Sequence, residues 1–168
     1  MNETNSIRVG EELNRENLQN FLDENLNLID QSLEIEQFPA GSSNLTYAVK
    51  IGVDEYVLRR PPFGNTVKSA HDMKREFDVL EKLSKVYQPA PAPLIYCADD
   101  GVIGSEFYLT ERRHGLIIRG KSPEILENSA KLPKKVCESF IENLANFHAL
   151  DYKEIRLGDL GKPRAILV

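Results

Sequence analysis

The stretch from Tyr56 to Leu83 limits the possible folds more strongly than any other part of this sequence. Its first residues, 56–60, have the composition of a short β-strand, and Pro61-Pro62 follows them directly. Proline has no N–H to give to a sheet and restricts the residue before it, so a paired strand must end at Arg60. Apolar residues then recur at helical spacing and predict a helix over residues 70–86: Met73, Phe77, Leu80, Leu83 and Tyr87.

The start of this helix has a signature of its own. Ser69-Ala70-His71-Asp72 resembles a capping box, in which side chains satisfy the free N–H groups of the first helical turn. We therefore expect the helix to begin near Ser69. Glu76 lies beside the apolar stripe, so we expect its carboxylate to be neither fully buried nor fully exposed.

Alternation of apolar and polar residues predicts four further strands. The clearest pattern covers residues 45–51, where four large apolar residues alternate with small or polar ones. Weaker patterns cover residues 33–38, 94–97 and 106–110. Together with residues 56–60, these segments predict one antiparallel sheet with the 70–86 helix packed on it.

Helices are predicted on both sides of these strands in the sequence. Near the start, Asn14 is placed to cap a helix whose buried face includes Leu18 and Leu22. Near the end, the spacing of four residues predicts an amphipathic helix from Pro133 to about Leu150: Val136, Phe140, Leu144 and Phe147. Monomeric proteins seldom expose such an apolar stripe, so we expect either self-association or a carboxy-terminal partner that covers it.

Composition excludes several classes of function. The 168 residues have a net charge of −5, and residues 1–40 hold nine acidic and two basic residues, which argues against a nucleic-acid or anionic-membrane binder. There is no long apolar run, and the start is polar, which predicts a cytoplasmic protein. Two isolated cysteines and three scattered histidines give no zinc-binding pattern.

Six strings in this sequence resemble the aminoglycoside phosphotransferase and choline kinase superfamily, and in particular its branch of kinase-like domains fused to acyl-CoA dehydrogenases. They span about residues 35–163 and are FPAGSSNLTYAV, YVLRRPPFG, AHDMKREFDVLEKL, FYLTERRHG, LANFHALD and LGDLGKP. The resemblance implies an α+β fold with a protein-kinase-like amino-terminal lobe, made of a five-stranded antiparallel sheet and a helix, followed by the first helices of a second lobe. It divides the chain into a helical extension (1–32), the lobe with its hinge (33–115) and the start of the helical lobe (116–168).

The residues around Arg59 then predict a nucleotide site. Val57 and Arg59 point to the same face of their strand, so Val57 could cover a base while Arg59 reaches its phosphates. A guanidinium matches phosphate oxygens with a planar fork, and Glu76 would hold it by a charge-assisted hydrogen bond. The alternative is an ordinary surface arginine and a solvated helix glutamate.

Two further segments acquire roles only through the resemblance. Gly41-Ser42-Ser43-Asn44 would be the loop that covers the phosphates, although the same composition also suits an ordinary hairpin turn. Thr110 would lie at the back of the adenine pocket, with the carbonyl of Glu111 and the N–H of Arg113 as adenine partners. The alternative for Thr110 to Arg113 is a plain strand end.

The family's His-Gly-Asp catalytic loop and its metal-binding acidic segment are not found in this sequence. We therefore assign no catalytic or metal-binding residue, and we interpret His148 and Asp159 as structural. The predicted function is the nucleotide-binding half of an ATP-dependent phosphotransferase that acts on a hydroxyl of a small metabolite, inactive alone, with Mg²⁺ expected only in a complete enzyme. The alternatives are a non-catalytic, truncated kinase-like module that binds a nucleotide or a protein partner, and a ligand-free structural remnant.

Overall fold

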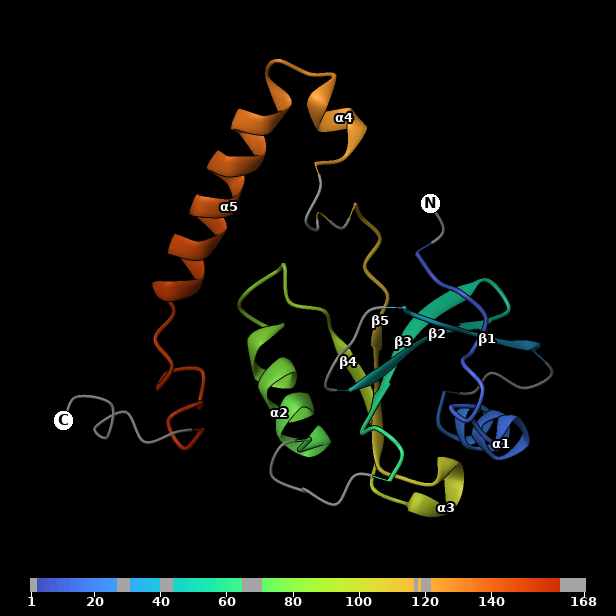
Figure 1. Ribbon diagram of the computed structural model, residues 1–168. Helices are drawn as coiled ribbons and strands as arrows, with labels where there is room; N and C mark the ends of the chain where they lie inside the picture. The colour runs from blue at the N-terminus through green and yellow to red at the C-terminus, as the bar shows by residue number, and fades with distance from the viewer. Residues whose placement is uncertain are drawn as a thin grey trace. The chain divides into compact units, whose positions relative to one another are not determined.

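The computed structural model describes residues 3–26, 31–39, 44–64, 71–116, 118 and 122–160. The chain divides into two compact units, Met1–Arg112 and Arg113–Val168 (Figure 1). The division falls within the segment predicted to be a hinge.

The first unit is built on a five-stranded antiparallel sheet, which confirms the predicted α+β fold. The strands are β1 (Leu33–Gln37), β2 (Leu45–Ile51), β3 (Asp54–Arg60), β4 (Pro93–Cys97) and β5 (Phe107–Glu111), in the spatial order β1-β2-β3-β5-β4. The central strand β3 ends at Arg60, immediately before the two prolines, as the missing proline N–H groups require.

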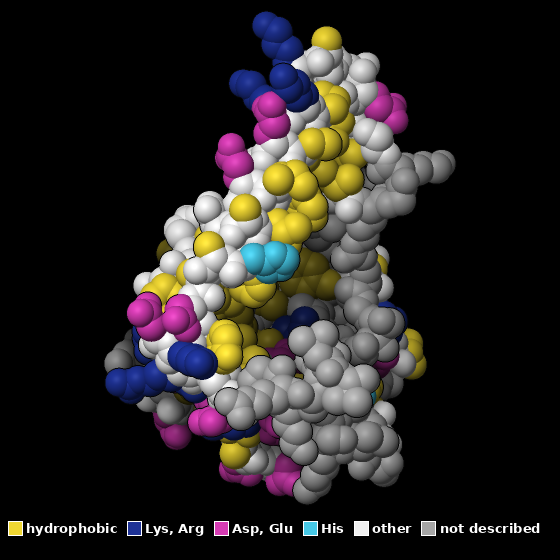
Figure 2. Space-filling view, turned by 90° about the vertical axis from the view of Figure 1, so that its left-hand side faces the viewer, with side chains coloured by type: hydrophobic (Ala, Val, Ile, Leu, Met, Phe, Trp, Pro, Cys, Tyr) yellow, Lys and Arg dark blue, Asp and Glu magenta, His cyan; other side chains and the backbone are white. Residues whose placement is uncertain are grey.

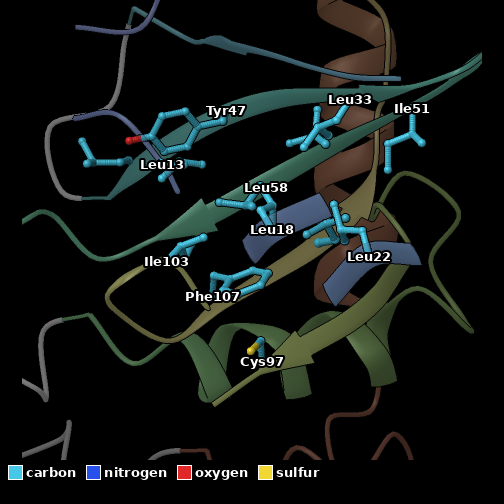
Figure 3. Close-up of a cluster of buried hydrophobic side chains, with 13 residues drawn as sticks. Leu13, Leu18, Leu22, Leu33, Tyr47, Ile51, Leu58, Cys97, Ile103 and Phe107 are labelled. Carbon is cyan, nitrogen blue, oxygen red and sulfur yellow. The ribbon is translucent and has the colours of Figure 1, made fainter. Parts of the chain in front are cut away.

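One face of the sheet carries the hydrophobic core (Figure 3). Two helices pack on it: α1 (Arg15–Leu26), which begins after Asn14 as predicted, and α3 (Asp100–Ile103). Leu18 and Leu22 of α1 are fully buried against alternate residues of the strands. Because α1 shares the core of the sheet, the predicted extension 1–32 is part of the same compact unit. The short helix α3 lies between the two strands that were predicted over residues 94–97 and 106–110, where no helix was predicted.

The opposite face is covered on one side by α2 (Met73–Leu83) (Figure 1). Phe77 of α2 packs against Tyr96 of β4 and Tyr108 of β5. Its ring centroid lies 5.9 Å from that of Tyr96 and 6.3 Å from that of Tyr108. The helix begins later than predicted, because the side chain of Asp72 caps it by accepting a hydrogen bond from the N–H of Arg75. Ser69, where we expected the start, lies outside the described residues.

The amino-terminal segment, residues 3–13, is attached to the edge strand β1. Asn5 and Gln37 exchange two backbone hydrogen bonds of 2.9 Å each. The side chain of Gln37 is buried; it accepts a bond from the N–H of Arg8 and donates one to the carboxylate of Glu11. These bonds satisfy an edge that would otherwise present unpaired backbone groups.

The second unit contains α4 (Glu124–Glu127) and α5 (Leu132–His148), with Pro133 in the first turn of α5. Apolar side chains along α5 are exposed, including Phe140 (63%) and Ile141 (60%). Figure 2 shows hydrophobic side chains gathered along this helix. No helix in the described parts of the chain has both the length and the apolar character needed to span a membrane.

Candidate functional site

Arg59 and Glu76 meet on the sheet face that α2 covers. Arg59 Nε lies 3.1 Å from Glu76 Oε2, and Arg59 Nη2 donates a 3.4 Å hydrogen bond to Glu76 Oε1. The two side chains are 37% and 35% exposed, so the pair is neither solvated nor sealed off. Strand β3 supplies the cation and helix α2 supplies the carboxylate, as the sequence predicted.

Two neutral side chains complete the shell of Glu76. Asn44 Nδ2 donates to Glu76 Oε1 at 2.9 Å, and the hydroxyl of Tyr108 donates to Glu76 Oε2 at 2.8 Å. The side-chain carbonyl oxygen of Asn44, Oδ1, lies 2.6 Å from His71 Nδ1. A carbonyl oxygen can only accept, so His71 Nδ1 carries the proton of this bond.

Tyr108 is suited to act as a permanent donor. It is buried between the sheet and α2, and burial, together with its bond to Glu76, raises the pKa of its hydroxyl above the ordinary range. The phenol therefore stays protonated across the physiological range of pH. It can donate to the Glu76 carboxylate without adding charge to the site.

A row of small and apolar side chains lies beside Arg59. In the strand register Val57 is opposite Ala48 of β2 on one side and Thr110 of β5 on the other. Ala48 and Thr110 are buried, and Val57 is half-buried. Two residues along β3, Arg59 points to the same face, so these side chains form a largely apolar strip next to a cation.

Residues 110–112 of the predicted hinge are held in the first unit by hydrogen bonds and ion pairs. The backbone N–H and the carboxylate of Glu111 both bond to the backbone of Ala92, and its carbonyl accepts a 3.1 Å bond from the Thr110 hydroxyl. Arg112 pairs with Glu3 (3.0 Å) and Glu55 (3.3 Å). Arg113 belongs to the second unit, so its predicted role with Glu111 stays a prediction.

Part of this site could be predicted from the sequence. The pairing of Arg59 with Glu76 was predicted, and Asn44 was predicted as part of the phosphate-covering loop; Gly41, Ser42 and Ser43 lie outside the described residues. Tyr108, His71 and Ala48 were not predicted to be part of the site. The alternation within 106–110 places Tyr108 on the face of Thr110, but the pairing of β5 with β3 has no local signal in the sequence.

Metal binding has no support in the described ranges of the chain. No group of three or more His, Cys, Asp and Glu residues in these ranges could hold a metal ion. The magnesium ion expected in a complete enzyme therefore stays a prediction.

Known proteins resemble this chain over most of its length. The family model described as the phosphotransferase enzyme family matches residues 34–166. Acyl-CoA dehydrogenase family member 11 of Homo sapiens is 37% identical over an alignment of 137 residues, and the match covers 79% of this chain and 17% of that protein. Acyl-CoA dehydrogenase family member 10 of Mus musculus is 33% identical over 130 residues, or 77% of this chain and 12% of that protein.

A solved structure shares the fold. The crystal structure of a Ralstonia eutropha protein, provisionally named an aminoglycoside phosphotransferase, matches with a TM-score of 0.68 and 27% identity. The match covers 90% of this chain and 43% of that one. This chain therefore spans less than half of the solved chain and less than a fifth of the curated relatives above.

Proposed function

This chain belongs to the phosphotransferase enzyme family, and from that premise we propose that it is the nucleotide-binding half of an ATP-dependent phosphotransferase acting on a hydroxyl group. The parent enzyme would transfer a phosphoryl group to a small hydroxylated metabolite. Free Cys97 and Cys137 suit a reducing, cytoplasmic setting, in which ATP is also available.

The observation that carries this proposal is the ion pair between Arg59 and Glu76. Kinase-like enzymes use a strand cation, held by a helix glutamate, to bind nucleotide phosphates. Nε and Nη2 of Arg59 lie against Glu76, and a guanidinium has more N–H donors than this pair uses, so we expect Arg59 also to bind phosphate oxygens. Catalysis of phosphoryl transfer depends mainly on positioning and on neutralising charge, and this half would supply the nucleotide side of both.

The apolar strip beside Arg59 supports the nucleotide assignment. Ala48 and Val57 are small, uncharged side chains of the kind that can line a purine site, and buried Thr110 lies beside them on the β5 side. A base on this strip would place its phosphates toward Arg59. The strip and the cation thus fit the two chemically different ends of one ATP molecule.

Calorimetric titration of ATP into the purified chain tests the proposal, with a radiolabel assay for phosphate transfer run on the same samples. We expect saturable binding of ATP and no transfer to a panel of hydroxylated metabolites. Absence of binding would contradict the nucleotide assignment. Transfer that disappears in Arg59→Ala would contradict the expectation that this half is inactive alone.

The second candidate is a non-catalytic module that binds a nucleotide or a protein partner. The exposed apolar side chains of α5 favour it, because such a surface is typical of a protein contact. A partner that binds the chain equally well with and without ATP, when ATP itself does not bind, would select this candidate.

A further inference from the structure

The shortest hydrogen bonds to Glu76 come from neutral side chains, not from its cationic partner. Its shortest hydrogen bonds come from Tyr108 (2.8 Å) and Asn44 (2.9 Å). Arg59 contributes a longer bond of 3.4 Å from Nη2 and an ion pair of 3.1 Å from Nε. The Nε–H of Arg59 is buried and aligned with no acceptor in the described part of the chain. Asn44 and Tyr108 therefore help to fix the carboxylate against which Arg59 lies, and Tyr108 also interacts with Arg59 directly.

The two donors are themselves immobilised. Asn44 and Tyr108 are 5% and 2% exposed; Asn44 directly precedes β2, and Tyr108 belongs to β5. The amide of Asn44 is oriented by His71, which donates to its carbonyl, and the ring of Tyr108 packs against Phe77 of α2. Both oxygens of Glu76 are therefore fixed relative to the sheet, although Glu76 itself belongs to the helix.

We propose that Asn44 and Tyr108 are positioning residues for Arg59, which orient the Glu76 carboxylate so that the guanidinium is aimed before any nucleotide binds. The proposal rests on the proposed function, because it gives the donors a role in phosphate binding. A cation that is already ordered loses less conformational freedom when its ligand arrives. If the donors were removed, Glu76 could rotate and Arg59 would lose its fixed partner.

The chain offers a matched control for Tyr108. Tyr96 also donates its hydroxyl to a glutamate, Glu106 (2.5 Å), and its ring also contacts Phe77. Tyr108→Phe and Tyr96→Phe therefore each remove one hydroxyl that donates to a carboxylate, but only the first touches Glu76. Any effect of losing such a bond on general stability is common to both variants.

The test measures two properties of these variants. Nitrogen-15 relaxation of the Arg59 Nε–H group, recorded without ligand, reports the mobility of the side chain, and calorimetry reports the affinity for ATP. We expect Tyr108→Phe to mobilise Arg59 and to weaken ATP binding by about three- to tenfold, the effect of one typical hydrogen bond. Tyr96→Phe should change neither property.

Asn44→Ala provides a second variant and should also mobilise Arg59, which keeps the test decisive if Tyr108→Phe does not fold. The proposal is overturned if Arg59 stays as rigid as in the unaltered chain, or if Tyr96→Phe mobilises it equally. If the unaltered chain binds no ATP, the proposed function fails, and the relaxation comparison still decides whether the two residues position Arg59.

Discussion

The side-chain amide of Asn44 should contribute measurably to the free energy of unfolding. Its NH₂ group faces the Glu76 carboxylate and its carbonyl faces His71, so the two ends are not interchangeable. Asn44→Asp would place a second carboxylate against the first one in a buried position. We expect the free energy of unfolding to fall by about 1–3 kcal/mol, the cost of a buried polar group without its partner.

Thermal or urea unfolding of Asn44→Asp measures this loss. Asn20→Asp makes the same chemical change at an exposed position within α1 and serves as the control. If both variants are equally stable, the amide of Asn44 does not contribute to the site in the way described.

The ionisation of Tyr47 should make the free energy of unfolding depend on pH in the alkaline range. Burial raises the pKa of its hydroxyl to about 12, while an unfolded tyrosine ionises near pH 10. Between these values the unfolded chain binds fewer protons, so the free energy of unfolding must fall as pH rises, by at most about 1.4 kcal/mol per pH unit for one tyrosine. The stabilising effect is complete below about pH 10.

Urea unfolding of Tyr47→Phe at several alkaline pH values tests this sign. The variant should lose stability less steeply than the unaltered chain between about pH 10 and 12. Some slope should remain, because burial also raises the pKa values of Tyr96 and Tyr108. Equal slopes in the two proteins would mean that Tyr47 is not protected from ionisation in the folded state.

Among the secondary-structure elements, the amino-terminal segment depends on Gln37. Gln37→Glu would replace the donor that bonds to Glu11 with a second carboxylate. We expect residues 3–13 to detach from β1 while the sheet stays folded. Trypsin cleavage after Arg8 should then become several-fold faster, because the N–H of Arg8 is anchored to the same side chain.

Mass spectrometry of timed digests measures this cleavage. Gln31→Glu makes the same change at an exposed position just before β1 and should leave the rate unchanged. Equal rates in Gln37→Glu and the unaltered chain would show that the segment is held by other contacts.

The sheet could be predicted from the sequence because its signals are local. Strict alternation gave the bounds of β2, and the two prolines gave the end of β3. Helix α3 was missed because four residues are too short for a helical period, and Asp99 to Gly101 also suits a turn. The capping of α2 by Asp72 was missed because two helix-start signals lie close together in the sequence.

The candidate site was only partly predictable for a different reason. Arg59 and Glu76 lie within one continuous stretch, so a familiar pattern could connect them. The contacts of Glu76 with Asn44 and Tyr108 join residues 32 positions apart, and they depend on how α2 lies on the sheet. Such contacts are set by packing and register, which local patterns do not specify.

At the scale of the whole molecule, the exposed apolar side chains of α5 predict association. Burying one large apolar side chain contributes about 1.5–3 kcal/mol, so a few of them favour contact with another surface. We expect light scattering to show a mass that rises with protein concentration. Ile141→Lys should reduce this rise, because it places a charge among Phe140 and Leu144.

Glu142→Gln is the control for this variant. It changes the net charge by the same amount at an exposed neighbouring position of α5, without altering the apolar surface. A chain that stays monomeric at high micromolar concentration would contradict the expectation of association.

The central claim is that Arg59 binds the phosphates of a nucleotide, and comparison of ATP with adenosine tests it most directly. Calorimetry would measure both ligands against the unaltered chain, Arg59→Ala and Lys85→Ala, which removes an exposed cation at the far end of α2. We predict that Arg59→Ala weakens ATP binding by at least about tenfold, as expected for the loss of a charge-assisted contact, and leaves adenosine binding unchanged. Lys85→Ala should change neither affinity. Equal ATP affinities in Arg59→Ala and the unaltered chain would contradict the claim.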